Sequence, residues 1–184
     1  MRAIDTTFVM ATLLFAFPLS VRAQGEPVGK APAAEAIPRV EFAFEERVTI
    51  DPATVLGETP LGHRQFIPIT GGSVAGPKFN GQVLPYGFDF QLTYSKSDCT
   101  QLSASYFLKA DDGAVIHVFN EGLSCPNGPR TIFRPRIEAP KGPYEWMSRA
   151  TFVATLDLEP PAKAPPPGTA PVIAAVRIRI YQVL

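Results

Sequence analysis

The residues best suited to acid–base chemistry lie in the segment Phe88–Tyr94, which reads FDFQLTY. In an extended strand, Asp89 and Gln91 project from one face, whereas Phe88 and Phe90 project from the other. If the polar face lines an interior, Asp89 can give or accept a proton and Gln91 can hydrogen-bond to it. If that face meets solvent, both are ordinary surface residues. The composition of the strand leaves both orientations open.

Other side chains that could contact a ligand are spread along the chain. His117 alternates with Val115 and Phe119 and could point into a pocket. Arginines on an inward face could bind a carboxylate with two hydrogen bonds, whereas outward ones would keep the surface soluble. The lone tryptophan fits core packing better than a ligand contact. The further candidates of this kind are Tyr106, Trp146, Arg64, Arg149, Arg134 and Arg136.

No motif indicates a metal ion or a cofactor. The two histidines, His63 and His117, show no H-x-H or H-E-x-x-H spacing, and a catalytic zinc needs about three protein ligands. The stretch Gly71–Lys78, GGSVAGPK, resembles a phosphate-binding loop. However, Pro77 stands where that loop has its lysine, and Lys78 is followed by Phe79 rather than by Ser or Thr. We therefore expect no cofactor, and we expect these glycines to permit bends and bulges.

The first residues have the pattern of a secretory signal peptide. Arg2 precedes an apolar segment, Phe8–Leu19, which is too short for the roughly 20 residues of a membrane-spanning helix. Val21-Arg22-Ala23 resembles a cleavage site, so residues 1–23 are expected to be removed, leaving a flexible leader at 24–38. We expect a periplasmic or secreted protein with no membrane contact after cleavage.

Charge and cysteine content bear on the partners and on the compartment. The chain has 17 Lys and Arg and 17 Asp and Glu, and loss of Arg2, Arg22 and Asp5 brings the formal charge to −1. This balance disfavours a nucleic-acid partner. In an oxidising compartment the two cysteines, Cys99 and Cys125, are expected to form a disulfide rather than to remain free thiols.

Short strand-like segments run through residues 39–184. The segments are Val40–Ile50, Arg64–Thr70, Gln82–Leu84, Phe88–Tyr94, Ser103–Ala110, Ala114–Asn120, Thr131–Glu138, Tyr144–Leu158 and Val172–Leu184. A proline-rich loop is expected at Glu159–Pro171. Many strands in one domain predict an all-β fold, a single-domain antiparallel β-barrel. The strands are short and are interrupted by prolines, so we expect a soluble barrel rather than an outer-membrane barrel.

The chain also resembles a known family over residues 40–184. The resemblance is carried by the glycine series G-G-x3-G-x4-G at residues 71–81, by G-x-D-x-Q at 87–91 and by the D-D-G turn at 111–113. These elements are similar to domain-of-unknown-function family DUF3237, also called uncharacterised protein family UPF0311. The resemblance implies a compact β-barrel and no established reaction. Phe90 stands where the family pattern has Trp, and the proline-rich loop looks like an insertion.

Together these patterns predict a barrel that binds a small organic molecule in its interior or mouth. An enzyme that uses Asp89 as acid or base is one alternative, and a structural or interaction module with a filled barrel is another. A cavity inside the barrel would separate the last alternative from the other two. The sequence leaves the ligand and the oligomeric state open.

Overall fold

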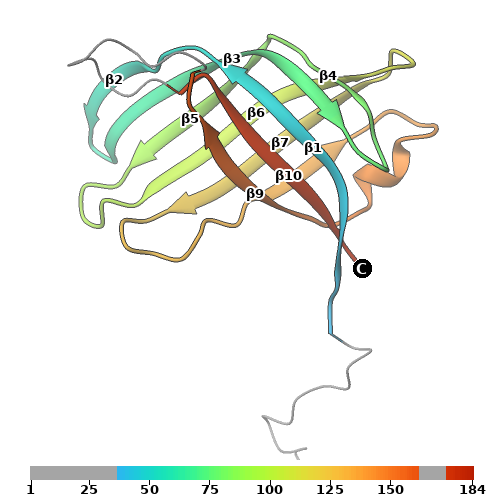
Figure 1. Cartoon of the computed structure of the whole chain (residues 1–184). Coiled ribbons are helices and arrows are strands. Elements are labelled where there is room, and N and C mark those ends of the chain that lie inside the picture. The colour runs from blue at the N-terminus through green and yellow to red at the C-terminus, as the bar shows by residue number, and fades with distance from the viewer. Residues whose placement is uncertain (1–36, 162–172) are drawn as a thin grey trace, which may run out of the picture. The chain divides into compact units, whose positions relative to one another are not determined.

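The computed structural model describes residues 37–161 and 173–184 (Figure 1). The expected signal peptide, residues 24–36 of the expected leader and residues 162–171 of the expected proline-rich loop lie outside the described residues. Within the described part of the chain, no helix is long and apolar enough to cross a membrane.

The regular structure of the described ranges consists almost entirely of strands (Figure 1). The elements are β1 (Val40–Ile50), β2 (Thr54–Thr59), β3 (Gly62–Ala75), β4 (Gly81–Val83), β5 (Gly87–Thr93), β6 (Thr100–Ala110), β7 (Val115–Ser124), β8 (Arg134–Glu138), the 3-10 helix η2 (Glu145–Ser148), β9 (Phe152–Glu159) and β10 (Ala175–Val183). Alternating apolar residues produce most of these strands, because an extended chain sends successive side chains to opposite faces.

The strands form one antiparallel sheet that closes on itself. The sheet has 10 strands in the order β8-β7-β6-β4-β3-β1-β10-β9, while β2 pairs with β3, and β5 pairs with both β3 and β6. Phe133 and Ala154 exchange two backbone hydrogen bonds, each with an N···O distance of 2.9 Å, so the β8 end of the sheet meets β9. The all-β antiparallel barrel predicted from the sequence is confirmed.

Two segments differ from the predicted strands. The segment 54–59 forms β2, which was not predicted because TVLGET lacks apolar alternation and its pairing with β3 shifts register between Val55 and Gly57. The segment 144–158 is not one strand. It begins with η2, whose Met147 is fully buried, and only then continues as β9. Local alternation could not reveal a helical turn set by packing against the core.

The glycine-rich stretch is a bend in the long strand β3. Gly71 and Gly72 have φ angles of 137° and 145°, a backbone conformation that side chains rarely adopt. A Cβ atom at Gly72 would lie 2.0 Å from the backbone oxygen of Arg47 on β1. The prediction that glycines permit a bend here is confirmed for these two residues. The bend lets β3 pair with β1 in its second half and with β5 in its first half.

One end of the barrel is filled by aromatic side chains. Phe79 contacts both Phe44 and Tyr144, with 5.4 Å between ring centroids in each pair. The helix η2 adds buried Met147 and brings Trp146 to 5.9 Å from Phe152. Burial of these apolar groups closes this end, and any internal space is left toward the opposite end.

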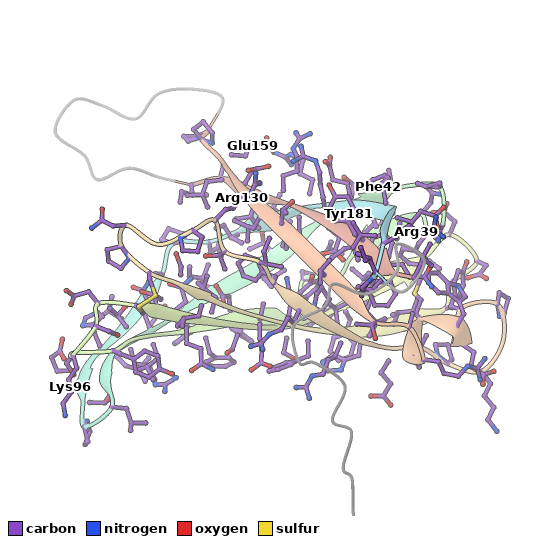
Figure 2. The ribbon with its side chains drawn as sticks, turned by 90° about the horizontal axis from the view of Figure 1, so that it is seen from below. Arg39, Phe42, Lys96, Arg130, Glu159 and Tyr181 are labelled. Carbon is purple, nitrogen blue, oxygen red and sulfur yellow. A yellow bond between two sulfur atoms is a disulfide. The ribbon has the colours of Figure 1, made fainter. Side chains whose placement is uncertain are left out.

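A disulfide joins Cys99 and Cys125, so the predicted bond is confirmed and the alternative of two free thiols is wrong. Thr100 pairs with Ser124, and the bond therefore lies one step beyond the last pair of the β6–β7 ladder. Figure 2 shows it as a yellow bond. The disulfide joins the start of β6 to the end of β7. These two strand ends lie opposite the β6–β7 turn, at the open end of the barrel.

Candidate functional site

A cavity of about 490 Å³ occupies the barrel interior next to the filled end. One wall is aliphatic and comes from β1, β9 and β10. Its side chains are Val48, Ile50, Leu156, Leu158, Val176 and Ile178. The opposite wall comes from β3, β5, β6 and β7, and its polar side chains are Gln65, Asp89, Gln91, Tyr106, Asn120 and Ser124. A molecule bound here would meet most of the hydrogen-bonding side chains on the wall formed by β3, β5, β6 and β7.

A hydrogen-bonded chain runs along the polar wall. Gln65 Nε2 donates to Gln91 Oε1 and Gln91 Nε2 donates to Asp89 Oδ2, with donor–acceptor distances of 2.7 Å in both cases. The backbone N–H of Ser103 donates to Asp89 Oδ1 over 3.0 Å. These bonds fix the rotamers of three side chains that project from neighbouring strands, so the carboxyl is held in one position against the cavity.

Burial raises the pKa of Asp89 above its ordinary value, although the hydrogen bonds from Gln91 and Ser103 favour the charged form and offset part of the effect. The free-energy cost of removing the carboxylate from water is larger than the stabilisation that these two hydrogen bonds give to the charged form. Asp89 therefore holds its proton to a higher pH than an exposed aspartate does, which suits a group that must donate a proton.

A second buried carboxyl, that of Glu46, contacts a residue of the cavity lining. Tyr106 lines the cavity, and its hydroxyl donates to Glu46 Oε2 over 2.6 Å. Glu46 is fully buried, and desolvation raises its pKa to about 7 despite this hydrogen bond. Burial and the neighbouring charges of Glu46 and Asp89 raise the pKa of Tyr106 well above its ordinary value. Near neutral pH, Glu46 therefore exchanges between its charged and neutral forms.

Ion pairs join β9 to the segments beside it. Arg130 lines the cavity and its Nη2 atom lies 2.6 Å from Asp157 Oδ1 on β9. Arg47 on β1 pairs with Glu159 at the end of β9, with Nη2 and Oε1 2.8 Å apart. Figure 2 shows Arg130 and Glu159 toward the same end of the barrel. These pairs hold β9 to β1 and to the connection after β7.

Three of the residues selected from the sequence meet in the cavity. Asp89 and Gln91 point inward from β5, and Tyr106 points inward from β6. Of the two orientations left open for FDFQLTY, the structure therefore has the polar face inside. Phe88 and Phe90 are correspondingly 41% and 47% exposed on the outer face.

Four other predicted ligand-binding residues lie away from the cavity, and the prediction that His117 points into a pocket is wrong. His117 lies on the outer face of β7, where its Nε2 atom is 2.9 Å from Ser105 Oγ. Arg64 alternates with the cavity-lining Gln65 and faces outward from β3. Trp146 is partly buried against the core at the filled end, and Arg149 forms an exposed pair with Glu145. His117 and Arg64 face outward because they alternate along their strands with inward-facing residues. Trp146 and Arg149 lie away from the cavity because the segment around them forms the helix η2 instead of a strand.

Three residues of the site were not selected from the sequence. Glu46, Gln65 and Asn120 all line or underlie the cavity. Glu46 is the single polar residue on the inward face of β1, where it lies between Phe44 and Val48. A polar residue among core-facing apolar residues was the feature of the sequence that could have indicated these positions. Such a side chain is costly to bury unless it has a hydrogen-bond partner, so it often marks a functional position. Among the described residues, no cluster of three His, Cys, Asp or Glu side chains could hold a metal ion.

The family described as "Protein of unknown function (DUF3237)" has a model that matches residues 38–183. The chain belongs to this family. A UPF0311 protein of Clostridium acetobutylicum is 41% identical over 132 residues, which cover 61% of this chain and 82% of that protein. The crystal structure of a conserved protein of unknown function from Rhodopseudomonas palustris superimposes with a TM-score of 0.66 at 30% identity, covering 80% of this chain and 99% of that chain.

A further relative of this chain has a named activity. The hydroalkoxylation enzyme of Penicillium herquei is 31% identical over 118 residues, which cover 64% of this chain and 74% of that protein. The family resemblance inferred from the glycine series and the G-x-D-x-Q motif is confirmed.

Proposed function

We propose that this DUF3237 protein binds a small, largely apolar organic molecule in the barrel cavity and transfers protons to and from it through Asp89. The position of the Asp89 carboxyl carries the proposal, because it faces a cavity of about 490 Å³ whose opposite wall is aliphatic. Cavities of this size accommodate small organic molecules. The raised pKa of Asp89 supports a role as proton donor. A filled structural module would leave no such space.

The similarity to a hydroalkoxylation enzyme supports a particular class of reaction. Hydroalkoxylation adds the oxygen and the hydrogen of an alcohol or phenol O–H bond to the two carbons of a carbon–carbon double bond, which gives an ether. In the proposed step, the Asp89 carboxylic acid gives its proton to one alkene carbon while the substrate oxygen bonds to the other. The Asp89 carboxylate then takes the proton released from that oxygen. The product is an isomer of an intramolecular substrate, so the step needs no redox partner.

The Asp89→Asn variant separates binding from turnover. The substitution keeps the size of the side chain, and the Gln91 and Gln65 amides can reverse to hydrogen-bond to the new amide. We expect 2-naphthol to bind the wild type and the variant similarly. Conversion of 2-allylphenol to its cyclic ether should fall at least about 100-fold, because the amide cannot transfer a proton. Calorimetry measures the binding, and chromatography measures the product.

The matched control for this experiment is Asp112→Asn, in the exposed turn between β6 and β7, where Asp112 Oδ1 accepts a hydrogen bond from Ala114 N. This variant should bind and convert like the wild type. Equal turnover by wild type and Asp89→Asn would contradict the acid–base role while leaving the binding proposal in place. Failure of the wild type to bind 2-naphthol or any similar apolar phenol would contradict the binding proposal itself.

We further propose that the protein is exported to the periplasm or to the exterior. The signal-peptide pattern of residues 1–23 supports this location. The Cys99–Cys125 disulfide also supports it, because such bonds persist in oxidising compartments. Mass spectrometry of the exported chain should show Gln24 as its first residue. Recovery of the chain from the cytoplasm with Met1 retained would contradict this proposal.

A further inference from the structure

Asn120 is a buried polar side chain without a hydrogen-bond partner for its carbonyl group. It is 2% exposed, and its Oδ1 atom accepts no hydrogen bond from any described residue. The same residue lines the cavity from β7. Buried polar groups are nearly always hydrogen-bonded, and the exceptions often have a role in binding or catalysis. The unpaired acceptor at Asn120 therefore calls for a donor that the described part of the chain does not supply.

The register of the sheet places Asn120 level with Asp89. Asp89 on β5 pairs with Ala104 on β6, and Ala104 pairs with Asn120 on β7. The two polar residues thus lie two strands apart in one row, with backbones separated by about 10 Å along the direction of the ladder. Ala104 is the residue between them, and its methyl group leaves space in front of this part of the wall.

The lining residues from β1 and β10 include no hydrogen-bonding side chain. Val48, Val176 and Ile178 form that wall, from β1 and β10. A ligand that satisfies both sides must be apolar over its body and polar at two points along one edge. Flat aromatic or alicyclic skeletons with two hydroxyl groups have this distribution.

We propose that Asn120 is a second ligand-binding residue in the cavity and that the molecule bound here carries two hydroxyl groups, one near Asp89 and one that hydrogen-bonds to the side-chain amide of Asn120. The inference rests on the proposed function, because it concerns the same cavity. It adds the chemical class of the ligand, a diol on an apolar ring system. Asn120 takes no part in proton transfer and contributes to affinity and orientation.

The test compares two ligands that differ by one hydroxyl group, 2,6-dihydroxynaphthalene and 2-naphthol. Calorimetry should show that the wild type binds the diol at least about 10-fold more tightly, the usual effect of one additional hydrogen bond to a buried group. Asn120→Leu keeps a similar volume, and its affinity ratio between the two ligands should fall to about one. Phe119→Leu, on the outer face of the same strand, is the matched control and should keep the wild-type ratio.

Two outcomes would overturn this inference while leaving the proposed function intact. One is equal affinity of the wild type for the diol and 2-naphthol. The other is an unchanged preference for the diol in Asn120→Leu, since the second hydroxyl would then bind elsewhere. Should the Leu variant not fold, Asn120→Ala provides the same ratio. If neither ligand binds the wild type, the proposed function fails together with the inference.

Discussion

Replacing Glu46 by Gln should remove about 3 kcal/mol of pH dependence from the free energy of unfolding between pH 4 and pH 8. Glu46 is fully buried, and its pKa in the folded protein is about 7, against 4.5 for an exposed glutamate. As pH rises through this interval, the unfolded chain loses its Glu46 proton first, so the folded state becomes less stable relative to it. The full penalty is present above pH 7 and absent below about pH 4.

Urea unfolding of the wild type and of Glu46→Gln at several pH values measures this difference. The amide of the variant can still accept the hydrogen bond of Tyr106, but it has no proton to release. The matched control is Glu138→Gln, which removes an exposed carboxylate from β8 and should keep the pH dependence of the wild type. Parallel curves for the wild type and Glu46→Gln would contradict the raised pKa, because Glu46 would then titrate alike in the folded and unfolded chains.

The all-β fold could be predicted because alternation is a local property of the sequence. In β10, Ile178 and Ile180 are buried while Arg177 and Arg179 reach the outer face, where Arg179 pairs with Glu45 and Asp157. A one-residue slip would bury both arginines, so the hydrophobic pattern fixes the register of this strand. The helix η2 has no such local pattern, and its position depends on contacts with distant strands.

The interior face of β5 could not be predicted in the same way. An apolar face is expected to point inward, yet Phe88 and Phe90 point outward, where both contact the ring of Phe66 from β3. Asp89 and Gln91 point into the cavity because the barrel keeps an internal space with hydrogen-bonding partners. One of these partners is Gln65 on β3, which is 26 residues from Gln91 in the sequence. Only the tertiary structure brings these partners together.

The same reasoning explains why Glu46 and Asn120 were missed. Both lie on the inward face of a strand, next to buried apolar residues such as Phe44 and Val118. A single polar residue in such a stripe indicates an unusual position, but the sequence does not say whether it meets a partner, a cavity or solvent. For Glu46 the partner is Tyr106, 60 residues away along the chain.

The central claim is that a small molecule binds inside the barrel, and Ala104→Phe tests it most directly. Ala104 lines the cavity between Asp89 and Asn120, so a phenyl ring at this position would fill the space that a ligand needs. The barrel should remain folded, because the ring enters an existing cavity and aromatic residues are well suited to strands. Ala104→Leu fills less of the space and provides a second variant of intermediate size.

The measurement is the affinity for 2-naphthol by calorimetry, with far-ultraviolet circular dichroism to verify that each variant is folded. We predict that the wild type binds 2-naphthol, that Ala104→Leu binds it more weakly and that folded Ala104→Phe shows no detectable binding. Undiminished binding by folded Ala104→Phe would contradict the claim, because the ligand would then occupy a site outside the barrel cavity.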